Sequence, residues 1–276
     1  MKPNLMLPRV FAYTFVVFLA ILCIFPFYIS VINATRSATE INTRIRLLPG
    51  FSAGENIAEL FRRVNLLRGF LNSTIISLST ILLSCYFGAA AAYGLAMFSF
   101  RGKTFCLALV LLTLLVPPQV GLVGFVEMLN KVELVDTYWP LILPGIANSF
   151  VIFFLKQYME TSLNSAYLEA ARIDGGSELY IFHHIILPMI MPGLATMAVL
   201  VFIGSWNNYL LPLTILFSQE NFTLPILISQ LTATTYRTNW GSVYMASTLS
   251  FLPILLMFLV FSRRMMDSVS LGGSKE

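Results

Sequence analysis

The sequence contains little charge for its length. Only 11 % of its 276 residues are Asp, Glu, Lys or Arg, whereas a soluble domain typically carries about 25 %. A large soluble core would not explain this deficit, because a soluble protein still covers itself with polar groups. A surface that faces lipid would explain it, and 57 % of the residues are hydrophobic. The net charge of +4 is mild and forms no basic stripe, so we expect no nucleic-acid partner.

Motifs for catalysis and metal binding are also missing from the sequence. It has no G-x-x-x-x-G-K-[ST] phosphate loop, so we expect that the chain does not hydrolyse ATP itself. The histidines, His183 and His184, do not form H-E-x-x-H, and no Ser-His-carboxylate triad is recognisable. The cysteines, Cys23, Cys85 and Cys106, sit in apolar runs without metal-ligand spacing, so we expect small buried hydrophobic residues. We therefore predict no catalytic residue, no metal and no cofactor in this chain.

Long charge-free stretches predict the architecture. A membrane-spanning helix needs about 20 predominantly apolar residues, and a charge at its centre costs about 2.5–3.5 kcal/mol. Six charge-free stretches of the sequence are long enough. We predict an all-α integral membrane protein, with residues 1–276 forming a single transmembrane domain. The expected spans are residues 10–32, 70–97, 105–127, 139–156, 190–213 and 241–262.

Two of these stretches, residues 70–100 and 185–219, exceed one bilayer thickness, so we expect them to tilt, break or extend into the interface. Prolines in the third and fifth stretches are consistent with breaks, which membrane proteins tolerate where the backbone is buried or lines a cavity. The first stretch is longer than the apolar run of a signal peptide and no clear cleavage site follows it, so we expect a retained helix. The prolines are Pro117, Pro118, Pro188, Pro192 and Pro212.

The distribution of Lys and Arg predicts the orientation. Six spans place both termini on one side, and cytoplasmic loops carry an excess of positive charge close to the span ends. With both termini in the cytoplasm, the short outside loops hold only Lys131 and Arg237, while the long outside segment 33–69 holds six more. We predict a multi-pass protein of the cell membrane (inner or plasma membrane) with cytoplasmic termini. The residues placed inside are Lys2, Arg9, Arg101, Lys103, Lys156, Arg172, Arg263, Arg264 and Lys275.

The loop of residues 160–188 reads as a helix–turn–helix on the cytoplasmic face. Residues 163–175 have apolar positions at three- and four-residue spacing, which favours a short amphipathic helix. Gly175 and Gly176 would end it, because glycine accepts the left-handed conformation at a helix C-terminus. Ser177 can cap a second short helix that runs to about Ile186.

Two functions fit this loop equally well on physical grounds. It could be a rigid lever for a partner protein, because Ala170 and Ala171 allow close approach, and Glu169 and Arg172 offer charge-assisted hydrogen bonds. It could instead be an interfacial helix that rests on lipid headgroups.

A longer pattern resembles a known family. Glu169-Ala170-Ala171, then Gly175, then Ile185-x-Leu187-Pro188 resemble the EAA loop of ABC importer permeases, with every motif position present at the family spacing. Residues 134–144 and 205–213 resemble the carbohydrate branch of that family, which includes the maltose and multiple-sugar permeases. Within each permease pair of that branch, the resemblance is to the shorter, six-helix subunit.

The resemblance implies roles and partners. The loop would be the coupling helix that sits in a cleft of an ATPase subunit. The partners would be a second permease subunit, two ATPase subunits that bind ATP and Mg, an extracytoplasmic solute-binding protein, and a sugar. A non-sugar solute, such as a polyol or glycerol phosphate, is the alternative. The residues that carry the coupling role are Glu169, Ala170, Ala171, Asp174, Gly175, Ile185, Leu187 and Pro188.

Polar residues in the fifth stretch are candidates for the solute pathway. Sugars present hydroxyl groups, so their sites combine amide and hydroxyl partners with aromatic faces. Hydrogen bonding between helices explains the same residue types. A stand-alone secondary carrier is a further alternative, but it would need intramembrane charges or inverted repeats, which the sequence lacks. The predicted pathway residues are Ser205, Trp206, Asn207, Asn208 and Tyr209, with Asn72, Ser73, Tyr86, Asn148 and Ser149 as weaker candidates.

Overall fold

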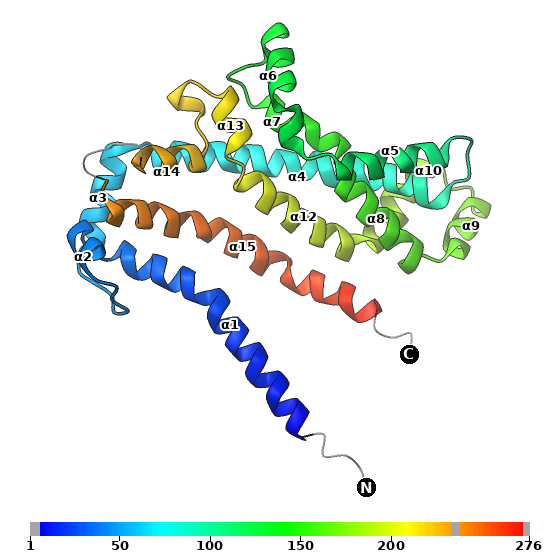
Figure 1. The fold of residues 1–276 in the computed structure, drawn as a ribbon. Helices are drawn as coiled ribbons and strands as arrows, with labels where there is room; N and C mark the ends of the chain where they lie inside the picture. The colour runs from blue at the N-terminus through cyan, green and yellow to red at the C-terminus, as the bar shows by residue number, and fades with distance from the viewer. Residues whose placement is uncertain (1–5, 233–237, 273–276) are drawn as a thin grey trace. The chain divides into compact units, whose positions relative to one another are not determined.

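A computed structural model describes residues 6–232 and 238–272, and every regular element in that part of the chain is a helix (Figure 1). The all-α prediction is therefore confirmed. Lys2, Arg237 and Lys275, which entered the charge count above, lie outside the described residues. The chain divides into two compact units, Met1–Leu66 with Leu227–Leu252 and Leu67–Ile226 with Pro253–Glu276.

Several helices are long and apolar enough to cross a membrane. Within the described residues, four continuous segments meet that description, and two bent helix pairs raise the number to six if each pair is one span. The four are Phe11–Ala34, Leu66–Met97, Trp139–Ser162 and Trp240–Arg263. The bent pairs are Lys103–Leu115 with Pro118–Lys131, at 89°, and Glu178–Met189 with Met191–Trp206, at 76°.

Prolines explain where the pairs bend. Proline lacks a backbone N–H and its ring clashes with the preceding helical turn. The first bend lies between Leu115 and Pro118 and contains Pro117, and the second lies between Pro188 and Pro192, so the breaks expected from these residues are observed.

The first unit contains α1(Met6–Ala34), α2(Ala38–Thr43), α3(Ala53–Arg63), most of α14(Leu224–Thr232) and the first part of α15(Trp240–Gly272). Buried Asn56 of α3 holds it together, because its amide donates to the carbonyl oxygens of Ala34 and Arg36, both at 2.8 Å. Gly241 of α15 packs so closely here that an added Cβ would lie 2.3 Å from the Asn56 Oδ1 atom. Glycine is thus required where α15 begins.

The second unit packs around α4(Leu66–Met97), drawn in cyan in Figure 1. One core cluster joins α4 to α8(Ser149–Ser162), α9(Ser165–Ile173), α10(Glu178–Ile181) and α12(Met191–Trp206). It includes Tyr93, Leu155 and Ile186. Gly88 of α4 lets α8 approach closely, because an added Cβ would lie 2.7 Å from the Val151 Cγ1 atom. The other α-helices of this unit are α5(Lys103–Leu115), α6(Leu122–Lys131), α7(Trp139–Ile142), α11(Leu187–Met189) and α13(Leu210–Ile215), with the parts of α14 and α15 that lie outside the first unit.

The cysteines are less buried than predicted. Cys85 is partly buried within α4, but Cys23 of α1 and Cys106 of α5 are exposed. The prediction that all three are buried is wrong for these two. An apolar run in a membrane-spanning chain does not imply burial, because its outer face can lie against lipid or a partner.

Candidate functional site

The predicted helix–turn–helix is present in unit 2. Asn164 caps α9, and its side chain accepts a hydrogen bond from the Ala166 N–H at 3.0 Å. Gly175 adopts φ +83°, a left-handed conformation that favours glycine. The Gly176 N–H then donates to the Ala171 carbonyl oxygen at 3.0 Å, which closes the end of α9. Ser177 caps α10 by accepting from the Tyr180 N–H at 3.3 Å.

The outer face of α9 and its turn is exposed. The predicted coupling residues Glu169, Ala170, Asp174 and Gly175 all lie on this face. Large apolar side chains accompany them, and Ile173 is 85 % exposed. Exposed apolar side chains beside small residues and a carboxylate form a surface suited to a protein partner. The other large apolar residues exposed here are Tyr167, Leu179 and Tyr180.

The inner face of α9 is anchored in the core. Leu168 is buried, and Ala171, the remaining coupling residue of the first arm, packs against the same cluster. Arg172 is exposed but bonds to a neighbour in the loop, because its Nε donates to the Glu178 carboxylate at 2.7 Å. The sequence offered this arginine as a contact for a partner, but in the structure it bonds within the loop.

The second arm continues from α10 through a π-helical turn, η3(Phe182–Ile186), into α11. The Leu187 N–H donates to the Phe182 carbonyl oxygen across this wider turn, and Pro188 follows it without a donor. Ile185 and Leu187 pack against the core cluster, whereas Pro188 is exposed. Ile185 and Leu187 therefore attach the second arm to the core of unit 2.

A hollow of about 560 Å³ lies in the second unit beside the break between α12 and α13. Every residue that lines it is uncharged. Four of them carry a hydroxyl or an amide, namely Thr80, Asn148, Ser205 and Asn208. Such a lining suits a neutral solute that forms hydrogen bonds.

The structure separates the predicted pathway residues. Ser205 and Asn208 line the hollow, and Asn208 also lines an adjoining one of about 470 Å³ next to Pro118 and Gln119. Trp206 is buried, with its ring stacked on Phe202 at a centroid distance of 5.3 Å.

Asn207 and Tyr209 are exposed, and neither lines the two hollows. The Asn207 amide donates to the Ile203 carbonyl oxygen at 3.0 Å. The five residues around the helical break therefore face three environments, namely the hollow, the core and the exposed surface.

The weaker candidates also divide. Asn148 lines the hollow, but Asn72 and Ser73 are buried and fasten the chain segment after α13. The Asn72 amide donates to the carbonyl oxygens of Glu220 and Phe222, at 2.7 and 2.9 Å. Thr80 was not predicted, because Ser77, Ser79 and Ser84 carry hydroxyls on the same helix and the sequence does not show which of these residues lies beside the cavity.

Ser149 and Tyr86 bond to other side chains. The Ser149 hydroxyl accepts from Thr113 Oγ1 at 2.6 Å, and the Tyr86 hydroxyl lies 3.1 Å from His183 Nε2. Both contacts link helices of unit 2, as interhelical hydrogen bonds do in membrane proteins.

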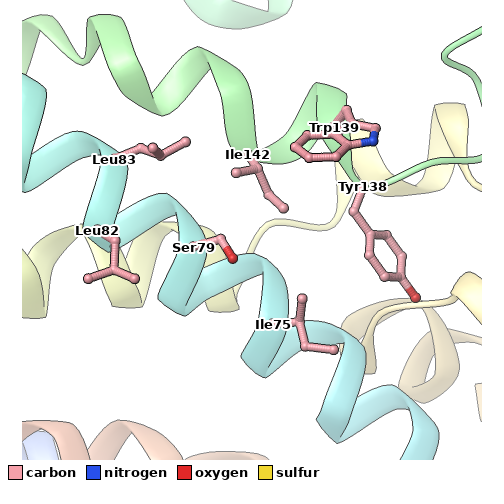
Figure 2. A pocket seen from close by; sticks show the side chains of 7 residues that line it. All are labelled: Ile75, Ser79, Leu82, Leu83, Tyr138, Trp139 and Ile142. Atoms are coloured by element: carbon pink, nitrogen blue, oxygen red, sulfur yellow. The ribbon is translucent and has the colours of Figure 1, made fainter.

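An apolar groove of about 520 Å³ lies elsewhere on α4. Figure 2 shows Ser79 of α4 and Ile142 of α7 directed toward the same space, with the Trp139 ring beside them. Its other walls are leucine, isoleucine and tyrosine side chains. This lining offers few hydrogen-bonding groups, so the hollow beside α12 is the better candidate for a polar solute.

Asp136 fastens the loop between α6 and α7 to the segment after α13. Its carboxylate accepts hydrogen bonds from the Phe217 N–H at 2.9 Å and from the Ser218 backbone and hydroxyl. Burial opposes ionisation of this carboxyl, but the bonds from Ser218, Phe217 and Asn221 outweigh it and lower its pKa to about 2. The described residues contain no His, Cys, Asp or Glu cluster that could hold a metal ion.

Comparisons with known proteins agree with this architecture. Residues 84–266 match the family model described as binding-protein-dependent transport system inner membrane component. An arabinooligosaccharides transport system permease, AraQ of Halalkalibacterium halodurans, is 35 % identical over 94 % of this chain and 93 % of its own. A lactose transport system permease, LacG of Rhizobium radiobacter, is 32 % identical over 98 % of this chain and 97 % of its own.

A solved structure shares the fold. The crystal structure of a bacterial ABC transporter involved in the import of the acidic polysaccharide alginate matches with a TM-score of 0.80, at 20 % identity. The match covers 95 % of this chain and 99 % of the other.

The chain belongs to the family of binding-protein-dependent transport system inner membrane components. It is a multi-pass permease subunit of an ABC importer, and such a subunit works with a second permease, an ATPase and a solute-binding protein.

Proposed function

We propose that this permease imports a neutral sugar or oligosaccharide. The single observation that carries the proposal is the hollow beside α12, whose lining is uncharged and supplies hydroxyl and amide groups from Thr80, Asn148, Ser205 and Asn208. The transport systems named for AraQ and LacG carry arabinooligosaccharides and lactose, which supports a saccharide. A glycerol phosphate would bring a charge for which this lining has no partner.

The loop of residues 160–188 is, in this proposal, the docking element for an ATPase subunit. Support comes from the exposed outer face around Glu169, Ala170 and Gly175, and from the packing of Leu168 into the core behind it. A surface that is exposed on one side and anchored on the other is suited to transmit force. ATP-driven closure of the ATPases would move the loop and reorient the permease pair, driven by contacts that differ between the two states.

The proposed topology has six crossings with both termini in the cytoplasm. The positive charges of Arg101 and Lys103, between α4 and α5, support a cytoplasmic position for that turn. Cysteine substitution tests it after the native cysteines are replaced by alanine, since Arg101→Cys should then react with a membrane-impermeant maleimide only from the cytoplasmic side. Reaction of Arg101→Cys from outside in intact cells would show that this turn is extracytoplasmic, which would contradict the proposed topology.

Co-purification followed by reconstitution tests the proposed function. The chain is tagged in its host, solubilised gently and analysed by mass spectrometry. We expect an ATPase and a second, distinct permease to be recovered. Proteoliposomes with the solute-binding protein are then supplied with labelled arabinotriose, lactose or glycerol phosphate, and ATP-dependent uptake of a saccharide is expected. A chain that purifies alone and still transports would contradict the importer assignment. Uptake of glycerol phosphate without uptake of either saccharide would contradict the proposal that the solute is a sugar.

A further inference from the structure

One carboxylate in the loop joins three elements of unit 2. Glu178 of α10 accepts a hydrogen bond from the Tyr93 hydroxyl of α4 at 2.8 Å through Oε2. Its other oxygen accepts from the Arg172 Nε of α9 at 2.7 Å. Both oxygens are thus occupied, one by each helix, and Glu178 is a direct polar bridge between α9 and the C-terminal end of α4.

Aromatic contacts support the same bridge. The Tyr93 ring packs against Phe182 at a centroid distance of 5.6 Å and against Phe98 at 5.3 Å. The Arg172 guanidinium carbon lies 5.4 Å from the centre of the Phe98 ring. Stacking on an aromatic ring and a charge-assisted hydrogen bond both restrict the arginine. The three polar groups are therefore held in one geometry.

Without this bridge, α9 would be attached by little else. It is one short helix between an extended segment at Leu163 and a left-handed turn at Gly175. Its apolar contacts with the core come from Leu168 and Ala171, while most of its residues are exposed. A helix held by so few contacts can rotate about its ends unless a directional bond fixes it.

We propose that Glu178 is the positioning residue that makes α9 and the C-terminal end of α4 move as one body, with Tyr93 and Arg172 acting through it. The inference rests on the proposed docking role of α9 and adds the route by which displacement of α9 reaches a membrane-spanning helix. Because the ion pair is partly exposed, its worth for stability alone is small. The role of the ion pair is to fix the orientation of α9 relative to the C-terminal end of α4.

The test measures a distance in the complete complex. Nitroxide labels are placed at Ala166→Cys on α9 and Leu82→Cys on α4, both exposed, after replacement of the native cysteines by alanine. Pulsed electron paramagnetic resonance then records the distance distribution without nucleotide and with ATP and Mg²⁺. We expect one narrow distribution that stays unchanged when ATP is added. Glu178→Ala should broaden it and let ATP shift it.

Milder variants keep the test valid if Glu178→Ala fails to fold. Tyr93→Phe removes only the link to α4 and should also broaden the distribution. Glu178→Gln keeps an acceptor for Tyr93 but loses the charge that holds Arg172, and should lie between wild type and Glu178→Ala. Matched controls are Tyr13→Phe on α1 and Glu127→Gln in the Glu127–Lys131 ion pair, and both should match the wild type.

Failure of the Glu178 bridge and failure of the docking role of α9 give different results. Wild-type distributions for Tyr93→Phe and for each folded Glu178 variant, with and without ATP, would overturn the positioning role. The docking role of α9 predicts that Glu169→Lys abolishes uptake. If Glu169→Lys did so while the Glu178 and Tyr93 variants kept wild-type distributions, the docking role of α9 would stand. If Glu169→Lys transported normally, the docking role would fail, and broadening in the Glu178 variants would still report a bridge between α9 and α4.

Discussion

The backbone N–H of Ser218 donates a hydrogen bond to the Asp136 carboxylate at 3.1 Å, joining positions 82 residues apart in the chain. Asp136 itself has φ +59°, an uncommon conformation for a residue other than glycine. Its N–H donates to the Ile215 carbonyl oxygen at 2.7 Å, and its own carbonyl oxygen accepts from the Asn221 amide at 2.8 Å. Side chain and backbone of one aspartate thus fasten the segment that follows α13.

This contact predicts a pH dependence of stability. The folded-state pKa of Asp136 is lowered from an ordinary 3.8 to about 2, because the hydrogen bonds favour the ionised form. The ionised carboxylate therefore stabilises the folded state above the unfolded-state pKa. That contribution is lost as the pH falls from about 4 toward 2. In detergent, the difference in Tm between wild type and Asp136→Asn should be largest near pH 6 and smaller at pH 3.

A difference in Tm that does not change with pH would contradict this assignment. Glu133→Gln is the matched control, because Glu133 lies in the same loop and also has a positive φ. It tests whether removal of any charge from this loop, rather than loss of the bonds to the Asp136 carboxylate, changes Tm.

Gly175 predicts a graded effect on coupling. At φ +83° an alanine costs about 1–2 kcal/mol, whereas proline cannot adopt this angle and also removes the N–H that donates to the Arg172 carbonyl oxygen. We expect Gly175→Pro to insert in the membrane but abolish uptake, and Gly175→Ala to retain part of it. Quantitative blotting of membranes and solute uptake measure the two properties.

Gly54→Ala in α3 is a control for glycine replacement, since nothing lies within 4 Å of an added Cβ there and Gly54 lines neither hollow beside α12. Uptake by Gly175→Pro at the wild-type rate would show that the turn is not needed for coupling.

Asn208 and its neighbour Asn207 predict opposite outcomes. Asn208 lines both hollows beside the break between α12 and α13, whereas Asn207 is exposed and bonds to the Ile203 carbonyl oxygen. Asn208→Leu should reduce solute uptake strongly while ATP hydrolysis continues, because a polar contact of the pathway is replaced by an apolar one. Asn207→Leu is the matched control and should transport well. Lower uptake by Asn207→Leu than by Asn208→Leu would show that the solute pathway does not pass through these hollows.

Gly88 predicts a packing defect. An added side chain would meet Val151 of α8 at 2.7 Å, so Gly88→Leu should destabilise the chain by about 1–3 kcal/mol, as overpacking does. Gly94 lies on the same helix with nothing within 4 Å of an added Cβ, and Gly94→Ala should be neutral or stabilising. Thermal unfolding in detergent compares the two, and equal Tm values would contradict the close approach of α4 and α8.

The sequence predicted much of this arrangement because membrane helices and turns have local causes. Charge-free stretches marked the apolar helices, prolines marked the two bends, and Gly175 with Ser177 marked the turn between α9 and α10. Each of these signals depends on a few neighbouring residues and on the cost of charge or of a missing N–H.

Contacts between distant residues could not be predicted in the same way. The direction of Arg172 depends on Glu178 and on Tyr93, which is 85 residues away from Glu178 along the chain. The division between buried Trp206 and the cavity-lining Asn208 depends on a break whose position the apolar pattern does not reveal. Thr80 lines the hollow only because α4 packs beside Leu141 and Gly145.

The docking role of α9 is the central claim, and crosslinking tests it most directly. A photoreactive p-benzoylphenylalanine is placed at Ile173, which is 85 % exposed on the outer face, and cells are irradiated. We predict a covalent product between this chain and the ATPase subunit, identified by mass spectrometry. The same probe at Leu115, which is 78 % exposed on α5, should not give that product. Crosslinks from Ile173 to lipid alone would contradict the account and favour a loop that rests on the membrane surface.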